Sequence, residues 1–144
     1  METSKLGLAI IKEFEEFKAE PYTCPAGKLT IGYGHVILQG EKFTKITEAE
    51  ADTILAEDVK IAEKAVSELV YFPLSQWQFD ALVSFVFNVG RGNFEKSTLL
   101  KCLQKEKYAL AANEFMRWIY AGENKMAGLM ARRRCEKIIF KAGS

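Results

Sequence analysis

Apolar residues recur at helical spacing near the start of the chain. The stripe predicts an amphipathic helix over about residues 4 to 18, and Pro21 is expected to end it. Its apolar members are Leu6, Ile10, Phe14 and Phe17. Such a helix should cover a core with its apolar face.

The rest of the chain reads mainly as further helices. Thr47 with Glu50, and Ser75 with Gln78, have the spacing of capping boxes at helix starts. The predicted helices cover about residues 47 to 70, 75 to 90, 97 to 105, 108 to 120 and 129 to 140. Gly122 and Gly128 interrupt the pattern before the last of them. The aromatic side chains expected in the helical core are Trp77, Phe79, Phe85, Phe87, Phe115 and Trp118.

One segment differs from this helical pattern. Between about residues 22 and 40, glycines and a proline punctuate short β-type runs such as Leu29-Thr30-Ile31. The predicted fold is therefore α+β: mostly helical, with a small N-terminal β lobe and a helical C-terminal lobe. We expect one domain over 1–144, divided into a helix and β patch (1–46), a connecting helix (47–70) and a helical lobe (71–144).

Composition supports a single globular domain. A chain of 144 residues that is 49% hydrophobic can bury a core without staples. Its three cysteines are odd in number and widely spaced, which argues against a disulfide framework or a structural zinc. The first residues lack the basic flank and apolar core of a signal peptide, and no run approaches the roughly 20 apolar residues of a membrane span. We therefore expect synthesis in the cytoplasm without stable membrane association.

Charge is divided unevenly along the chain. The net charge is +1, but up to Gly90 there are 8 Lys/Arg against 14 Asp/Glu, and from Arg91 onward there are 12 against 5. A basic half is typical of proteins that meet a polyanion, either nucleic acid or an anionic cell wall. It is equally compatible with a solvated surface. The chain has no helix-turn-helix or base-stacking motif, so we expect no nucleic-acid partner.

The first helix offers several carboxylates as candidate acids. Glu15 lies at the margin of the apolar stripe, while Glu16 points away from it. A carboxylic acid at such a margin can be half desolvated, which favours its protonated form, and still reach a cleft. Glu13 also lies near the stripe, so periodicity alone does not choose between them.

The segment that follows carries a more specific signal. It reads IKEFEEFKAEPYTCPAGKLTIGYGH over residues 11 to 35 and resembles the phage lysozyme (endolysin) family, the muramidases of glycoside hydrolase family 24. The family's site is a glutamate, eight residues, an aspartate or cysteine, five residues and a threonine. Glu15, Cys24 and Thr30 match both spacings. Gly128-Leu129-Met-Ala-Arg132-Arg133-Arg-Cys-Glu136 resembles the family's terminal motif, so the resemblance covers nearly the whole chain.

The resemblance implies a reaction and a role for each residue. The reaction is hydrolysis of the β-1,4 bond between N-acetylmuramic acid and N-acetylglucosamine in bacterial peptidoglycan, with no metal or cofactor. Glu15 would be the general acid, and Thr30 would hold the attacking water. Cys24 stands where many relatives have aspartate. It could act as a thiolate, as a nucleophile or by positioning, and the sequence leaves these alternatives open.

Other residues are weaker candidates for the site. Tyr33 is a candidate for the floor of the cleft, and Arg132 and Arg133 are candidates for contact with the glycan or its peptide stems. His35 is expected to tie its turn to a nearby carboxylate. The family usually has glycine where this chain has Glu16, whose charge we expect to lie in solvent.

The implied biology is lysis of a host cell by a monomer that waits in the host cytoplasm until the inner membrane is opened. Two alternatives share the fold. One is a catalytically silent module that binds cell walls. The other is a lytic transglycosylase, which leaves 1,6-anhydro ends and has no use for a water held by Thr30. A thiol hydrolase built on Cys24 and His35 would need a third residue, and none is evident.

Overall fold

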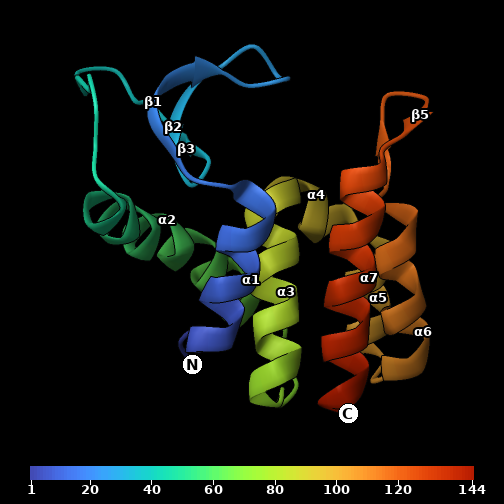
Figure 1. The fold of residues 1–144 in the computed structure, drawn as a ribbon. Helices are drawn as coiled ribbons and strands as arrows, with labels where there is room; N and C mark the ends of the chain where they lie inside the picture. The colour runs from blue at the N-terminus through green and yellow to red at the C-terminus, as the bar shows by residue number, and fades with distance from the viewer.

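The computed structural model describes residues 1–144 and has the predicted α+β architecture (Figure 1). Its elements in chain order are α1 (Lys5–Glu15), β1 (Lys18–Thr23), β2 (Leu29–Gly32), β3 (His35–Val36), α2 (Glu48–Leu69), α3 (Gln76–Val89), α4 (Arg91–Lys96), α5 (Thr98–Gln104), α6 (Tyr108–Glu114), the 3-10 turn η1 (Phe115–Arg117), β4 (Tyr120–Ala121), β5 (Asn124–Lys125) and α7 (Ala127–Ala142).

The first helix begins as expected but ends early. The hydroxyl of Ser4 accepts a hydrogen bond from the Gly7 N–H at 3.2 Å and caps α1. The helix ends at Glu15, because Glu16 has φ 59° and ψ 143°, far from helical values. The prediction that Pro21 ends the helix is wrong. Pro21 lies inside β1, an edge strand whose pairing with β2 changes register at this point, so its missing N–H is tolerated.

A three-stranded antiparallel sheet in the order β1-β2-β3 forms the small lobe. Tyr22 lies opposite Thr30 in the β1–β2 pair, and Ile31 lies opposite His35 in the β2–β3 pair. The sheet has its own small core, formed by Ile31, Ile46 and Ala51. Three apolar residues are too few to hold the sheet alone, so it depends on the helix that passes beneath it.

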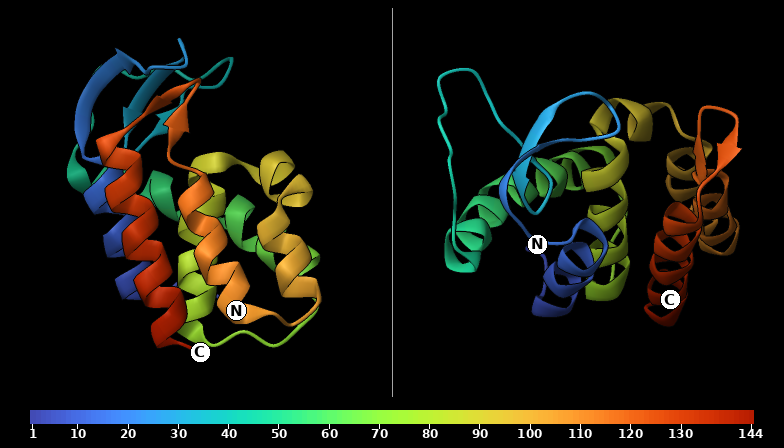
Figure 2. Two further views of the ribbon diagram at one scale, coloured as in Figure 1. Left: turned by 90° about the vertical axis from the view of Figure 1, so that its right-hand side faces the viewer. Right: turned by 45° about the horizontal axis from the view of Figure 1, so that its top comes forward.

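That helix is α2, and its start was predicted correctly. Thr47 and Glu50 make the expected capping box, and Ser75 and Gln78 make the one that begins α3. Ala51 of α2 packs in the small core of the sheet, and later residues of the same helix belong to the helical core. Figures 1 and 2 show the helix running from the sheet toward the other helices. It therefore joins the two cores through one continuous backbone.

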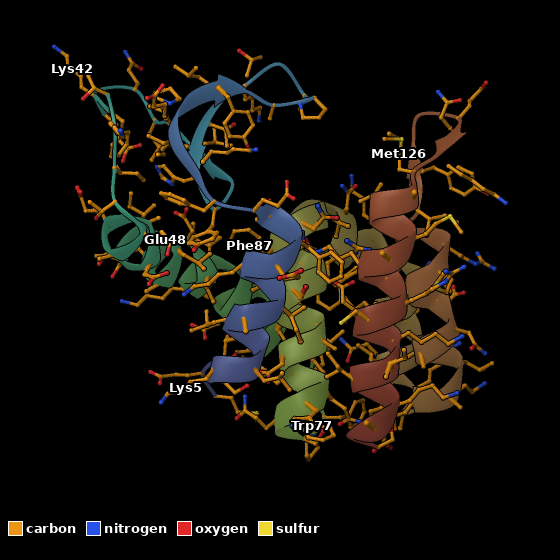
Figure 3. The ribbon with its side chains drawn as sticks, in the orientation of Figure 1. Lys5, Lys42, Glu48, Trp77, Phe87 and Met126 are labelled. Atoms are coloured by element: carbon orange, nitrogen blue, oxygen red, sulfur yellow. The ribbon has the colours of Figure 1, made fainter.

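The larger core surrounds α3, which is buried along nine successive residues from Gln78 to Val86. Phe79, Phe85 and Phe115 lie in it as predicted, with Phe85 and Phe115 stacked edge to face at 5.4 Å. Trp118 packs against Phe85 at its margin. Trp77 is 47% exposed, so its assignment to the core is wrong. It lies in the first turn of α3, at the end of the helix far from the sheet (Figure 3).

Short elements escaped the sequence analysis. The six-residue helix α4 and the β4–β5 hairpin are too short to show a period, and the hairpin turns at Gly122, with φ 63°. The helix predicted to about residue 120 ends at Glu114 instead. The last helix begins at Ala127, so Gly128 belongs to its first turn. No helix combines the length and the apolar character needed to cross a membrane.

Candidate active site

Glu15 is the last residue of α1, at the junction between the helical core and the sheet. Its side chain is 19% exposed, and its Oε2 accepts a hydrogen bond from Arg132 Nη1 at 2.7 Å. The neighbouring Glu16 is exposed, as expected. The structure therefore singles out Glu15 among the acids of this helix, because it alone combines partial burial with a charged partner from a distant segment.

Gly34 closes the other side of the Glu15 carboxyl group. It lies in the β2–β3 turn with φ 73°, and a Cβ atom placed there would lie 2.5 Å from Glu15 Oε1. Any larger residue would need both a strained backbone and the space that the carboxylate occupies. The turn glycine thus sets how closely the sheet approaches the acid.

Arg132 comes to Glu15 from α7 and is almost fully buried. Its Nη2 donates to the Ser84 carbonyl at 3.1 Å, and its Nε donates to Glu136 Oε2 at 3.3 Å. The Ser84 hydroxyl donates to the same Glu136 oxygen at 2.6 Å. Because Ser84 and Glu136 hold Nη2 and Nε of the Arg132 guanidinium, its orientation is fixed and its Nη1 is directed at Glu15.

Arg133 is not a residue of the cleft, and the expectation that it contacts the glycan is wrong. Its side chain has no exposed surface: it lies over the Phe85 ring at 5.0 Å, pairs with Glu136 at 3.2 Å and donates to Asn88. Burial lowers the pKa of Arg133 to about 10, against the charge of Glu136. Neighbouring positions on a helix point about 100° apart, so only Arg132 of the pair is directed toward the acid.

Cys24 and Thr30 face each other across the β1–β2 turn. This turn is closed by backbone hydrogen bonds from Cys24 N to Lys28 O at 2.9 Å and from Gly27 N to Cys24 O at 2.8 Å. Hydrogen bonds from the Lys28 N–H and the Thr30 hydroxyl lower the pKa of Cys24 below that of an ordinary thiol. The Thr30 hydroxyl also lies 3.0 Å from the Lys28 carbonyl. Because it has one hydrogen, it either donates to the carbonyl and accepts from a water, or stabilises the thiolate.

Tyr22 connects this turn to the acid. Its pKa is raised, first by burial and then by the negative charges of Glu15, Cys24 and Glu16. It is also the residue paired with Thr30 across the β1–β2 ladder. The charges of Glu15 and Cys24 thus both act on the Tyr22 phenol, and Thr30 is the partner of Tyr22 in the strand pair. Tyr22 was not among the predicted site residues, although it lies inside the matching motif.

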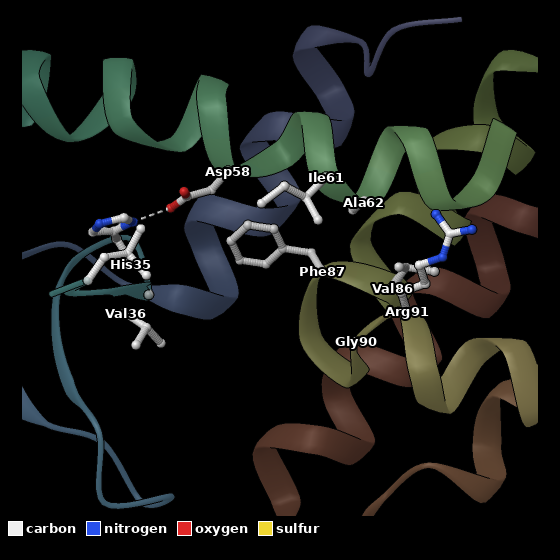
Figure 4. Close-up of a pocket in the computed structure, with 11 residues that line it drawn as sticks. His35, Val36, Asp58, Ile61, Ala62, Val86, Phe87, Gly90 and Arg91 are labelled. Carbon is white, nitrogen blue, oxygen red and sulfur yellow. Dashed lines mark hydrogen bonds and ion pairs between the residues drawn. The ribbon is translucent and has the colours of Figure 1, made fainter. Parts of the chain in front are cut away.

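A cleft of about 290 Å³ runs from Gly34 along the junction between the sheet and the helices (Figure 4). Its apolar wall is formed by Val36, Leu38, Ile61, Ala62, Val86 and Phe87. The prediction that Phe87 belongs to the core is therefore wrong in part: it packs against the core and also lines the cleft. Its place near the C-terminal end of α3 puts it close to the sheet (Figure 3).

His35 lies at the edge of the same cleft, bound to two carboxylates. Its Nδ1 is 2.7 Å from Asp58 Oδ2 on α2, and its Nε2 is 3.0 Å from Glu41 Oε1. Burial acts to lower the pKa of His35, but the two carboxylates outweigh it and the pKa is raised. The expected hydrogen bond between this histidine and a carboxylate is present. Because Asp58 belongs to α2, the bond joins the sheet to that helix and does not only stabilise the turn of His35.

Tyr33 is placed elsewhere. It packs against Phe17 at 5.8 Å and lies under the Lys12 ammonium at 5.5 Å, lining a separate shallow pocket beside α1. Successive residues of a strand or tight turn point in different directions, so Tyr33 and Gly34 do not share a face. The expectation that Tyr33 forms the floor of the cleft is wrong.

Two features of the site could not be chosen from the sequence. Glu136 has Arg132 and Arg133 at helical spacing in the terminal motif, but the sequence does not show that the group is buried beside Ser84, which lies 52 residues earlier. Gly34 is one of ten glycines, and only the fold shows which of them lies against Glu15. The structure contains no group of three or more His, Cys, Asp or Glu side chains arranged to hold a metal ion.

Comparison with known proteins gives one consistent result. The sequence model of the phage lysozyme family matches residues 12–136. An endolysin of Acyrthosiphon pisum secondary endosymbiont phage 1 is 38% identical over 148 residues, covering 99% of each chain.

Solved structures agree. A mutant of P22 lysozyme superposes with a TM-score of 0.87 at 35% identity, covering 98% of this chain and 99% of that one. The muramidase domain of SpmX from Asticaccaulis excentricus superposes with a TM-score of 0.88 at 35% identity, covering 96% of this chain and 97% of that one. The resemblance inferred from the motif and the expected lysozyme-like α+β fold are both confirmed.

Proposed function

Because this chain belongs to the phage lysozyme family, we propose that Glu15, Cys24 and Thr30 carry out its reaction. The chain is a glycoside hydrolase of the endolysin type, a muramidase whose substrate is bacterial peptidoglycan and whose action lyses the host cell. The assignment of the individual roles rests on the geometry of the cleft.

Glu15 is the general acid in this proposal. The observation that carries it is the position of its carboxyl group, which accepts a hydrogen bond from Arg132 and lies against Gly34, a residue that lines the cleft. A proton on Glu15 can pass to the glycosidic oxygen of a strand lying there. The apolar wall at Phe87 and Val36 suits the apolar faces of sugar rings.

Cys24 and Thr30 act on the opposite face of the sugar. Thr30 accepts a hydrogen bond from the attacking water, which its contact with the Lys28 carbonyl permits. With the Thr30 hydrogen given to the Lys28 carbonyl, the Lys28 N–H, which is the largest cause of the lowered pKa of Cys24, still favours its thiolate. The thiolate supplies negative charge and so stabilises the positive charge that develops on the sugar.

The test compares purified peptidoglycan digested by the native chain, by Glu15→Gln and by the matched control Glu13→Gln. Reducing muramic acid ends are expected from the native chain and the control, and a loss of about a thousandfold from Glu15→Gln. Full activity of Glu15→Gln would overturn the assignment of the acid.

The products also separate the two alternatives. Anhydro ends, formed even by Thr30→Ala, would replace hydrolysis with the transglycosylase reaction. Wall binding without any product from the native chain would favour a silent binding module.

We further propose that the protein acts as a monomer, because the proposed roles of Glu15, Cys24 and Thr30 need no residue from a second copy. Light scattering during size-exclusion chromatography should give the mass of one chain, and a stable dimer would contradict this. The wall is the site of action, and we propose that the protein reaches it from the host cytoplasm once the inner membrane is opened. Lysis by the chain expressed alone in an intact host would overturn that route.

A further inference from the structure

Four charged groups form a connected cluster behind the cleft. Arg132, Arg133 and Glu136 on α7 are 3%, 0% and 0% exposed, and Glu15 joins them through Arg132. Burying each such charge costs several kcal/mol unless it is paired, so a cluster of this kind is retained only with close partners. Only Glu15 of the four has a role in the proposed reaction.

Glu136 is held by one hydroxyl and two guanidinium groups. Its Oε2 accepts hydrogen bonds from the Ser84 hydroxyl at 2.6 Å and from Arg132 Nε at 3.3 Å, and Arg133 Nη1 forms an ion pair with its Oε1 at 3.2 Å. A guanidinium cannot accept a hydrogen bond, so a protonated Glu136 would leave the buried Arg133 without a counter-charge and Arg132 with Glu15 as its only anion. Burial raises the pKa of Glu136, but these two cations oppose that shift, and the geometry fits the carboxylate.

We propose that Glu136 is a positioning residue for the reaction: acting through Arg132, it fixes the direction of the bond to Glu15 and offsets the positive charge that would otherwise hold Glu15 ionised. The inference rests on the role of Glu15 as the acid. It assigns a function to the glutamate at the end of the Gly-Leu-x-x-Arg-Arg-x-x-Glu motif.

The argument concerns what Arg132 contacts when Glu15 takes up a proton. Arg132 then loses its anionic partner at Nη1, but Nε keeps Glu136 and Nη2 keeps the Ser84 carbonyl. Since the buried guanidinium stays paired, protonating Glu15 does not leave an isolated cation. Without Glu136, the only anion touching Arg132 would be Glu15, and Arg132 would oppose its protonation.

Other charges near Glu15 do not touch Arg132. On α7, Arg133 is held by Glu136 and Asn88. Next to Glu15 in the chain, Glu16 is exposed. Cys24 lies in the β1–β2 turn. Tyr22 on β1 is neutral at physiological pH, as tyrosines are, and its raised pKa favours the neutral form further. The α3 helix presents only uncharged groups here, those of Ser84 and Asn88.

The direct test follows the protonation of the Glu15 carboxyl group by carbon-13 NMR, with its signal assigned from its absence in Glu15→Gln. In Glu136→Gln the midpoint should fall by about one pH unit, and activity on peptidoglycan near neutral pH should fall about tenfold. Glu136→Asp keeps the charge and should restore most of the shift. An unchanged midpoint in a folded Glu136→Gln protein would overturn the proposal.

A second variant covers the case in which Glu136→Gln does not fold. Arg133→Met removes a buried cation and leaves Glu136 to Arg132 alone, so the Glu15 midpoint should rise instead of falling. A purely structural role for the cluster would destabilise both variants without moving the midpoint in opposite directions. A midpoint that stays or falls in folded Arg133→Met would refute the charge argument.

The failure of this inference can be distinguished from failure of the proposed function. If Glu15→Gln digests peptidoglycan normally, the acid is misassigned. If Glu15→Gln is inactive but the midpoints do not move, Glu15 remains the acid and only the role of Glu136 is lost.

Discussion

The two sides of the active site are built in different ways. On the sheet side, Cys24, Thr30 and Gly34 lie within eleven residues of one another and are held by a turn and short strands. On the helical side, Arg132 reaches Glu15 across 117 positions of sequence and is held by Ser84 and Glu136 in the interior. The sheet side therefore depends on backbone shape and on one ionisable turn residue, Cys24, whereas the helical side depends on the pairing of buried charges.

Among changes that compare the two sides, the largest loss of activity should come from Gly34→Ala, which tests the backbone shape of the sheet side. The new Cβ would meet Glu15 Oε1 at 2.5 Å, so the acid must move, and activity should fall by about a hundredfold or more. The matched control is Gly27→Ala, which has a similar φ of 81° but nothing within 4 Å of its Cβ. Both should lose about 1 kcal/mol of stability. Equal activity of the two variants would show that the contact with Glu15 is unimportant.

The next effect concerns charge on the same side. Replacing Cys24 with serine removes the ionisable thiol and should lower kcat about a hundredfold. Cys24→Asp supplies a permanent charge and should stay within a few-fold of the native rate. Because the thiolate fraction rises with pH, the ratio of native to Cys24→Asp activity should increase between about pH 6 and 8. A ratio that is flat across that range would argue that Cys24 acts without ionising.

The link between the two sides is tested by Asp58→Asn, which weakens the bond from His35 to α2. His35 has a raised pKa, so its contribution to stability is complete below the ordinary histidine pKa and is lost as pH rises through the raised value. The variant should lose about 2 kcal/mol at pH 5.5 and clearly less at pH 8, measured by urea unfolding. An equal loss at both pH values would mean that the protonated histidine adds nothing.

The smallest expected effect is a change in the free energy of unfolding at two strained residues, one beside the sheet and one in the helical lobe. Glu16 and Glu106 are the two residues other than glycine with positive φ, at 59° and 56°. Glu16 also has ψ 143°, a region used almost only by glycine, whereas Glu106 ends α5 with the hydrogen bonds of a helix cap. Glu16→Gly should raise the unfolding free energy by about 1 kcal/mol, and Glu106→Gly by about half that or less. Thermal unfolding that ranks the two in the opposite order would contradict this account.

Periodicity and capping residues predicted the long helices well. The capping boxes at Thr47 and Ser75 are local interactions between residues three apart, so their sequence spacing is enough to place them. Elements of two to six residues, such as α4 and the β4–β5 hairpin, contain too few positions to show a period. The end of α1 was misplaced because a strained Glu16, which no propensity favours, ends the helix in place of Pro21.

The predicted site likewise contains residues that local spacing could select and residues whose orientation it could not give. Spacing selected Glu15, Cys24 and Thr30. Two of them raise the pKa of Tyr22 and the third pairs with it across the strands, and the joint role of the three stays a prediction. The orientation of neighbouring side chains was not predictable: Tyr33 and Arg133 adjoin residues that face the site but point elsewhere themselves. Phe87 was assigned wholly to the core because an apolar residue that lines a cleft has the same sequence pattern as one that lies in a core.

The sequence by itself determined the local features of this protein: where the long helices start, which turn carries Cys24 and Thr30, and which family's motif they match. Only the tertiary structure decided which glycine lies against Glu15, which of two adjacent arginines binds it, and that the charges of α7 are buried beside Ser84. The physical reason is range. Hydrogen bonds within a turn or a helix cap join residues a few positions apart, whereas burial and ion pairing bring together groups whose separation in sequence carries no sign of their contact.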